Sequence, residues 1–310
     1  TDFSRKSIVD HFVGACMAFS NGMRVSIKEY LSPASYAFFS AFFFGDRGLL
    51  SRPIKAAFKN TGTYHILSIS GLHVGIFFFF AHFSLKLFRV PYKVRLLCSL
   101  FAVIVYALMS GCSLPTQRAC VMIAVFVASY FARRTIHPLQ TLGIALLAVL
   151  MMNPLSVHML GFWLSFLSVF CIIAGFTVVP FKRPPTPLET LLYTSFFASV
   201  ATAPLILKYF NTFPWVGILL NVLIVPLSAV ILFAGVSGMC LLLIPPLAQH
   251  IFLALDALIR LNLFIVAEAG KWGVVFFPGE KIPWTVLIVF YGLILIGVVR
   301  RVGWKQGMLT

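Results

Sequence analysis

Long apolar runs follow one another along most of this chain, and they constrain its fold more than any motif does. From about residue 65 onward, many of these runs approach the roughly 20 residues that an α-helix needs to cross a bilayer, and short polar loops separate them. Such spans must be helical, because a bilayer offers the backbone no hydrogen-bond partners. We place about nine spans, near residues 65–85, 96–112, 117–132, 138–153, 157–179, 188–209, 215–244, 246–270 and 284–300. The sequence therefore predicts an all-α, polytopic helical membrane protein with some broken and re-entrant helices.

Composition excludes a soluble globular domain. Hydrophobic residues make up 60% of the chain and charged residues 10%, with a mean hydropathy of +0.99, which leaves too little polar surface to coat a globule. The six cysteines are scattered without a C-x-x-C pair, so we expect neither a metal site nor a disulfide. The chain begins at Thr1 without an initiator methionine, and we expect it to be part of a longer protein.

The first 61 residues differ from the remainder, and we predict that residues 1–61 form amphipathic, interfacial helices ahead of a membrane domain at 62–310. Residues 1–30 mix charged and apolar residues at helical spacing. Residues 33–44 are apolar but too short to cross, so they either re-enter the membrane or pack against other helices.

A basic stripe is predicted just before the first span. Arg52, Lys55 and Lys59 recur at helical spacing and fall within about 60° of one another around a helix. Ile54 and Phe58 lie on the other side, so the helix should lie flat with its cations in water. An ordinary solvated helix face would look the same.

Loop charges give the topology. Basic residues occur in the loops near 90, 134 and 183 and are absent from 111–116 and 153–157, so the basic loops should be cytoplasmic. The first span then begins outside, which places the basic stripe on the outer face against the positive-inside trend. An incoming polyanion would account for cations at that position.

The octet SISGLHVG, which ends at Gly75, is a polar patch within the first apolar run. Gly71 and Gly75 form a G-x-x-x-G pair suited to close approach by another helix. On a continuous helix, Ser70 and His73 share a polar edge away from that packing face, and His65 is within reach of the same cavity. Ser70 and His73 could instead be structural, forming hydrogen bonds between helices.

Five segments in order resemble the ComEC competence family, the inner-membrane channel for single-stranded DNA in naturally transformable bacteria. The segments are GDR at 45–47, HILSISGLHVGI at 65–76, QRACVMI at 117–123, NPLSVHMLGFWLSFLSV at 153–169 and SVATAPLILKYFNTFPWVGILLNVLIVPL at 199–227. Ser68 and Ile69 stand where the family commonly has alanine before Ser-Gly-Leu-His. Residues 228–310 match only in hydrophobic character.

The resemblance implies flanking domains that this chain lacks. Family members usually carry an OB-like DNA-binding domain before the competence domain, and many carry a metallo-β-lactamase-like nuclease domain after it. The chain has no H-x-H-x-D-H signature, so any nuclease activity would belong to a domain outside it. We therefore expect residues 62–310 to be a non-enzymatic competence domain, the transmembrane channel, without a cofactor.

A route for single-stranded DNA through hydrocarbon needs cations at its mouth and polar groups along it. We predict that the basic stripe gathers phosphates outside and that Arg118 contacts phosphate inside. Pro204 and Pro226 fall within apolar runs, where we expect broken helices whose freed backbone groups need polar partners. Polar residues near these prolines could either line the path or cap the kinked helices locally. The predicted lining comprises His65, Ser68, Ser70, His73, Gln117, Arg118, Ser165, Thr202 and Asn221.

The chain contains no G-x-x-x-x-G-K-[ST] motif and no series of membrane carboxylates, so it holds no evident motor. The resemblance implies a cytoplasmic helicase-like ATPase and an outer-face DNA receptor as partners, besides single-stranded DNA and the lipid bilayer. It also implies a multi-pass location in the bacterial inner membrane.

Two other functions compete with a DNA channel. An intramembrane hydrolase could use Ser70 as nucleophile and His73 as base, although the sequence reveals no third orienting group. A small-molecule or ion transporter could bind its substrate at helices broken near Pro204 and Pro226, although we find no inverted repeat. The outer basic stripe favours a DNA channel over a transporter, because a carrier of cations or amino acids has no need of such a stripe.

Overall fold

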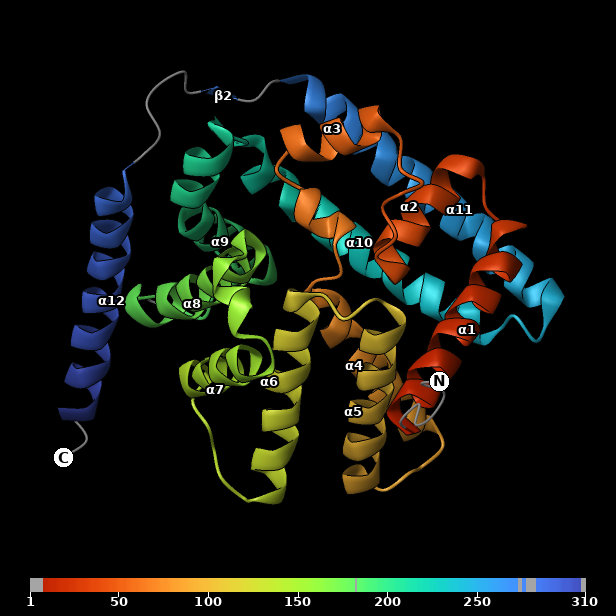
Figure 1. The fold of residues 1–310 in the computed structure, drawn as a ribbon, viewed down its shortest axis with the longest axis horizontal. Coiled ribbons are helices and arrows are strands. Elements are labelled where there is room, and N and C mark those ends of the chain that lie inside the picture. The colour runs from red at the N-terminus through yellow and green to blue at the C-terminus, as the bar shows by residue number, and fades with distance from the viewer. Residues whose placement is uncertain (1–7, 182, 273–274, 277–282, 308–310) are drawn as a thin grey trace, which may run out of the picture.

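The computed structural model describes residues 8–181, 183–272, 275–276 and 283–307, so the first seven residues of the predicted interfacial segment lie outside it. The fold is almost entirely helical, and Figure 1 shows the helices packed into one body with α12 along one side. The α-helices in the described part are α1 (Ile8–Lys28), α2 (Pro33–Phe44), α3 (Arg52–Asn60), α4 (Gly71–Leu87), α5 (Tyr92–Met109), α6 (Leu114–Phe131), α7 (Pro138–Met152), α8 (Leu160–Val178), α9 (Pro187–Phe210), α10 (Val216–Cys240), α11 (Pro245–Ala269) and α12 (Trp284–Gly307).

Short elements connect some of these helices. Three 3-10 helices occur in the described part, η1 (Tyr64–Leu67), η2 (Pro154–His158) and η3 (Gly270–Trp272). Two short strands, β1 (Thr212–Phe213) and β2 (Val275–Phe276), pair antiparallel, with Thr212 opposite Phe276. The chain thus carries one minor sheet in an otherwise helical membrane protein.

Each predicted span corresponds to one of the helices from α4 to α12. Six helical segments are long and apolar enough to cross a membrane, namely α5, α6, α8, α9, α10 and the segment 245–272 that contains α11. Helix α4 has 17 residues and α7 has 15, or about 26 and 23 Å at 1.5 Å per residue, which is less than the ~30 Å hydrocarbon thickness. The predicted class, a polytopic helical membrane protein, is confirmed.

The predicted first span, 65–85, was wrong at its start. The chain forms η1 and then an extended stretch at Ser68 and Ser70, and α4 begins at Gly71. Ser70 occupies the N-cap position with φ −110° and ψ 172°, so it cannot belong to the helix that follows. The polar half of this apolar run is therefore a turn and a helix start rather than a continuous helix.

Broken helices at Pro204 and Pro226 were also predicted wrongly, because α9 and α10 continue through these prolines. A proline inside a helix leaves one carbonyl without its N–H donor, and neighbouring groups in membrane helices commonly compensate. Pro204 frees the Val200 carbonyl, and the Tyr291 hydroxyl of α12 donates to the adjacent carbonyl, that of Ala201, at 2.7 Å. The Thr202 hydroxyl donates to the Ala198 carbonyl at 2.9 Å, a local bond to the preceding turn of α9.

Helix α2 lies in the main apolar core. Nine of its 12 residues are buried, including all five of its phenylalanines, and they pack in one cluster with buried residues of α10 and α11. Packing against other helices, one of the two roles expected for residues 33–44, is thus what the structure shows. Phe58 of α3 joins the same cluster, so α2 and α3 are built into the body of the membrane domain.

The two ends of the molecule differ in the segments that they carry. Figure 1 shows the loops that follow α4 and α6 at the bottom of the view, whereas α3 and the end of α9 lie at the top. The bottom loops carry Arg89, Arg133 and Arg134, so the positive-inside rule predicts that this end faces the cytoplasm. The basic stripe of α3 therefore lies at the opposite end, which we call the outer end.

Candidate functional site

The candidate site is centred on the start of α4, where Ser70 and His73 interact. The Ser70 backbone N–H donates to His73 Nδ1 at 3.2 Å, and Ser70 Oγ lies 3.0 Å from the same nitrogen. Because Nδ1 accepts the backbone N–H, the neutral imidazole must carry its proton on Nε2. His73 is 3% exposed, its Nε2 has no hydrogen-bond partner, and its ring packs on Phe42 with centroids 4.3 Å apart.

Arg118 lies beside this helix start, one turn into α6. It is 7% exposed, and its Nη1 donates to the Ser165 backbone carbonyl of α8. Its guanidinium carbon lies 5.8 Å from the Phe166 ring centroid, and Nε has no partner. No carboxylate pairs with Arg118 among the described residues. A buried cation without a counter-charge is costly, so this position is electropositive and suited to an anion.

Gly71 brings α4 and α6 together at this point. A Cβ atom placed on Gly71 would lie 3.2 Å from Arg118 Nη2 and 3.7 Å from the Ala119 Cβ. The close approach predicted for the Gly71 and Gly75 pair is absent at Gly75, where a Cβ would meet no atom within 4 Å. Gly71 is the first residue of α4, and it lies against α6. Gly75, one turn later, does not.

The GDR segment and the turn between α5 and α6 border the same site. Arg47 Nε donates to the Leu67 carbonyl at 3.1 Å, and a Cβ on Gly45 would lie 3.1 Å from the Ser110 carbonyl oxygen. Gln117 Nε2 donates to the Cys112 carbonyl at 2.8 Å, while its Oε1 is buried without a partner. Segments that are far apart in the sequence thus converge around Ser70 and Gly71.

The other predicted lining residues are placed differently. His65 and Ser68 are bound locally in the turn, with His65 Nδ1 3.2 Å from the Gly62 carbonyl and Ser68 Oγ donating to the His65 carbonyl at 3.0 Å. Asn221 Nδ2 of α10 donates to Ser195 Oγ of α9 at 3.0 Å, and its Oδ1 is buried without a partner. The Thr202 hydroxyl donates to the Ala198 carbonyl within α9. The structure therefore brings together Ser70, Gly71, His73, Arg118 and Ser165. Among the described residues, the hydrogen bonds of Thr202 and Asn221 go to residues of α9.

The basic stripe has the predicted arrangement on α3. Arg52 and Lys59 are exposed and Lys55 is half-buried, whereas Phe58 on the opposite face is fully buried. Lys59 Nζ lies 5.3 Å from the ring centroid of Phe210, the last residue of α9. The predicted mouth is thus amphipathic, with its apolar side packed on the core.

Sequence reasoning missed the residue that anchors α2. Asp256 of α11 is 8% exposed, and its Oδ1 accepts the Ser32 N–H at 3.0 Å and the Ser32 hydroxyl at 2.7 Å, at the N-terminus of α2. Arg260 Nε lies 2.7 Å from Asp256 Oδ2. An acidic residue within an apolar run signalled a buried partner, but nothing in the sequence identified Ser32.

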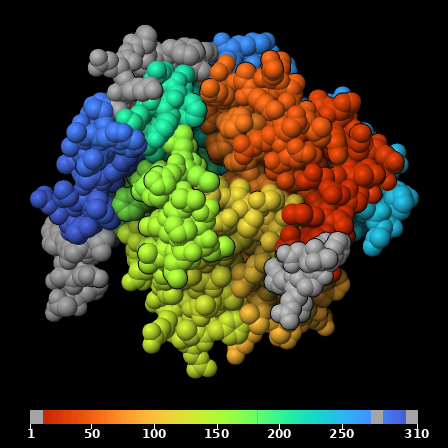
Figure 2. All heavy atoms as spheres, in the orientation of Figure 1, coloured from red at the N-terminus to blue at the C-terminus, as the bar shows by residue number. Residues whose placement is uncertain are grey.

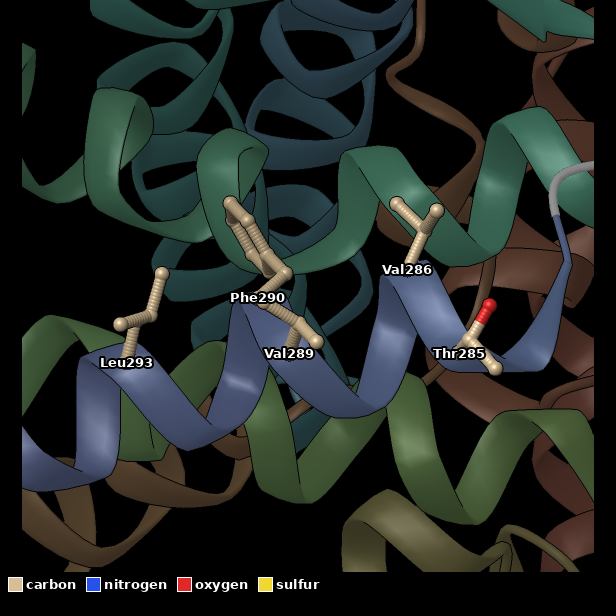
Figure 3. Close-up of a pocket in the computed structure, with 5 residues that line it drawn as sticks. All are labelled: Thr285, Val286, Val289, Phe290 and Leu293. Carbon is tan, nitrogen blue, oxygen red and sulfur yellow. The ribbon is translucent and has the colours of Figure 1, made fainter.

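The structure offers little sign of a second functional centre among the described residues. An apolar groove of about 380 Å³ runs along α12, and Figure 3 shows its lining residues Thr285, Val286, Val289, Phe290 and Leu293 projecting from that helix. Only Thr285 among them has a polar side chain. Among the described residues, no group of three His, Cys, Asp or Glu side chains could hold a metal ion.

Comparisons with known proteins agree on one family. The model of the Competence protein family matches residues 42–304. The chain is 28% identical over 219 residues to ComE operon protein 3 of Bacillus subtilis and 27% identical over 206 residues to Recombination protein 2 of Haemophilus influenzae. It is 33% identical over 193 residues to Competence protein ComA of Neisseria gonorrhoeae.

These alignments cover most of this chain but a minor part of each relative. They span 69%, 61% and 59% of the chain and 28%, 26% and 27% of the three relatives. The chain thus spans less than a third of the length of these relatives. No solved structure matches it significantly.

Proposed function

Because the chain belongs to the Competence protein family, we propose that it forms the membrane channel that carries single-stranded DNA across the bacterial inner membrane during natural transformation. The matched residues, 42–304, include the basic stripe, the start of α4, Arg118 and Ser165. The family match therefore covers the whole candidate site.

Arg118 is the observation that carries this proposal. A single strand has one negative charge per nucleotide, and a path through hydrocarbon must offset that charge. Arg118 is a buried guanidinium without a carboxylate partner in the described structure, and it lies against the first turn of α4, whose N-terminus adds partial positive charge. A phosphate group passing this point would supply the anion that the fold does not.

The basic stripe at the outer end favours transport of DNA from the outside inward. Arg52, Lys55 and Lys59 lie on α3, at the end opposite the basic loops, where positive-inside bias does not account for them. Cations at that end would raise the local concentration of a polyanion arriving from outside. We propose that DNA first contacts this surface and then reaches the buried site at the start of α4.

Energy and delivery would come from other proteins. The chain has no nucleotide-binding loop motif, so we propose that a cytoplasmic helicase-like ATPase pulls the strand and that a receptor on the outer face supplies it. The chain would then act as a passive path that selects and holds the strand.

We propose that the chain has no enzymatic activity of its own. Ser70 Oγ lies within reach of His73 Nδ1, as a nucleophile and base would, but the same nitrogen also accepts the Ser70 N–H. His73 Nε2, which an orienting carboxylate would bind in a hydrolytic triad, has no hydrogen-bond partner among the described residues. Capping of α4 accounts for the contact. A fluorophosphonate probe that labels Ser70 in the intact protein would contradict this assignment.

The transporter alternative loses its main support, since α9 and α10 are continuous through Pro204 and Pro226. A broken helix at those prolines was the feature that favoured a small-molecule or ion site.

DNA uptake in a transformable host tests the channel. We expect His73→Ala and Arg118→Ala in the full-length protein to lower transformation while DNA still binds the cell surface. For Arg118 the loss should be about 10- to 100-fold, the factor expected from losing a charge-assisted hydrogen bond of ~1.5–3 kcal/mol. Arg134→Ala is the matched control, because Arg134 is exposed in a loop at the opposite end. Normal transformation in both site variants, at wild-type protein levels in the membrane, would overturn the site assignment.

A further inference from the structure

Cations at the outer end are paired with aromatic rings. Arg47 lies over the Tyr64 ring at 5.3 Å, Lys59 over Phe210 at 5.3 Å, and Lys208 over Trp284 at 4.3 Å. Each distance is within the roughly 6 Å at which a cation is attracted to the face of a ring. These three pairs come from five separate segments of the chain, so their grouping is a property of the fold.

The end of α9 connects the three pairs. Lys208 and Phe210 occupy the last turn of α9, which links the second pair to the third. A Cβ on Gly62 would lie 2.8 Å from Pro214, so the segment that carries Tyr64 packs against the turn after α9. Figure 2 shows the orange region around α3 adjoining the teal end of α9 at the top of the molecule. The acidic residues described nearby, Asp46 and Glu268, are paired with Arg24 and Lys271.

The rings remain accessible despite these pairs. Tyr64 is 36% exposed, Phe210 46% and Trp284 57%. An exposed ring beside a cation presents two groups to a nucleic acid: the cation can contact a phosphate, and the ring can stack on a base. In a duplex, the neighbouring base pairs cover both faces of each base, so a side-chain ring can stack on a base only where the strand is unpaired.

We infer that Tyr64, Phe210 and Trp284, with Arg47, Lys59 and Lys208, form a surface that binds single-stranded nucleic acid by stacking and prefers it to duplex. This inference rests on the proposed function and adds a selectivity step at the outer end to it. The lysine and arginine side chains would contribute affinity for any strand, whereas the rings would contribute the preference for unpaired bases. The surface would thus favour unpaired DNA over duplex on the way to Arg118.

Oligonucleotide binding to the protein in lipid nanodiscs tests the inference. The probes are a labelled oligodeoxythymidine of about 16 nucleotides, an abasic strand of equal length and charge, and a duplex of that length. We expect Phe210→Leu and Trp284→Leu to weaken oligodeoxythymidine binding at least about fivefold, as a stacking contribution of 1–3 kcal/mol implies, and to leave the other two probes unchanged. Lys59→Gln should weaken all three probes.

Two controls keep the result decisive. Phe88→Leu replaces an 80% exposed aromatic just after α4, at the opposite end, and should change nothing. Phe210→Tyr keeps a stacking ring and should restore binding, which separates lost stacking from misfolding. Equal loss for all three probes in Phe210→Leu, or oligodeoxythymidine binding at wild-type strength, would overturn the inference. The second result would mean that the rings only anchor helix ends in the lipid interface.

Probe binding tests the stacking surface, and DNA uptake tests the channel, so the two can fail separately. If the wild-type protein supports DNA uptake but the ring variants bind all probes as it does, the channel stands and the stacking surface is wrong. If ring-dependent binding is found but deleting the protein leaves uptake unchanged, the surface stands and the channel is wrong.

Discussion

Arg118 and Asp256 are both buried charges within apolar helices, yet the fold surrounds them in opposite ways. Asp256 accepts two hydrogen bonds from Ser32 and pairs with Arg260 at 2.7 Å. Arg118 donates to one backbone carbonyl and has no carboxylate partner in the described structure. The fold thus compensates the acid and leaves the base uncompensated. Asp256 is thus a structural anchor, and we propose that Arg118 meets an anion that comes from outside the chain.

Asp256→Ala should give the largest change in stability. It removes a carboxylate from the N-terminus of α2 together with its bonds to Ser32, which should cost about 2–3 kcal/mol. The midpoint of thermal unfolding in nanodiscs, and the amount of protein in the membrane, measure this loss. Arg260→Ala is the control, since the Arg260 side chain is 65% exposed and an exposed partner contributes at most about 1 kcal/mol. Equal effects of the two substitutions would show that the ion pair, rather than the bonds to Ser32, anchors α2.

Arg118→Met should have the opposite profile. Replacing a buried, unpaired charge by an apolar side chain of similar length removes a desolvation cost along with one hydrogen bond, so stability should stay within about 1 kcal/mol of wild type. DNA uptake should fall in the same cells. A loss of stability as large as that of Asp256→Ala would assign Arg118 to the structure and remove the basis for a phosphate contact.

The sequence predicted the helices well because length and hydrophobicity determine them. It failed at the start of α4, since the apolar run continues without a break through η1 and hides the turn. The available signal was local: Ser70 is a favourable N-cap residue, and His73 stands at the third helical position, from which its side chain reaches back to Ser70. The predicted breaks at the prolines were wrong for a different reason. A membrane helix continues through a proline where its neighbours support it, and contacts such as that of Tyr291 with the Ala201 carbonyl come from distant segments.

The sequence predicted some residues of the candidate site but not the contacts between them. Motif residues identified Ser70, His73 and Arg118, but only the fold shows that Gly71 places α4 against Arg118 and that Ser165 contributes its backbone carbonyl. The pairing of Asp256 with Ser32 joins residues 224 positions apart. The outer rings Phe210 and Trp284 carry no pattern of their own in a chain with 33 phenylalanines. Contacts of this kind depend on tertiary packing and cannot be read from spacing.

Gly71 and Gly75 of α4 allow the smallest and most local test of the contrast between Arg118 and Asp256. Gly71→Ala places a methyl group 3.2 Å from Arg118 Nη2, so the guanidinium must shift, and we expect DNA uptake to fall by about fivefold, equivalent to ~1 kcal/mol. Gly75→Ala makes the same substitution one turn later, where no atom lies within 4 Å, and should leave uptake unchanged while favouring the helix by up to ~1 kcal/mol. Neither substitution touches Asp256, so the thermal midpoint should not fall in either variant. Uptake at wild-type levels in Gly71→Ala would mean that the exact position of Arg118 is unimportant, which a cation that must meet a passing phosphate does not permit.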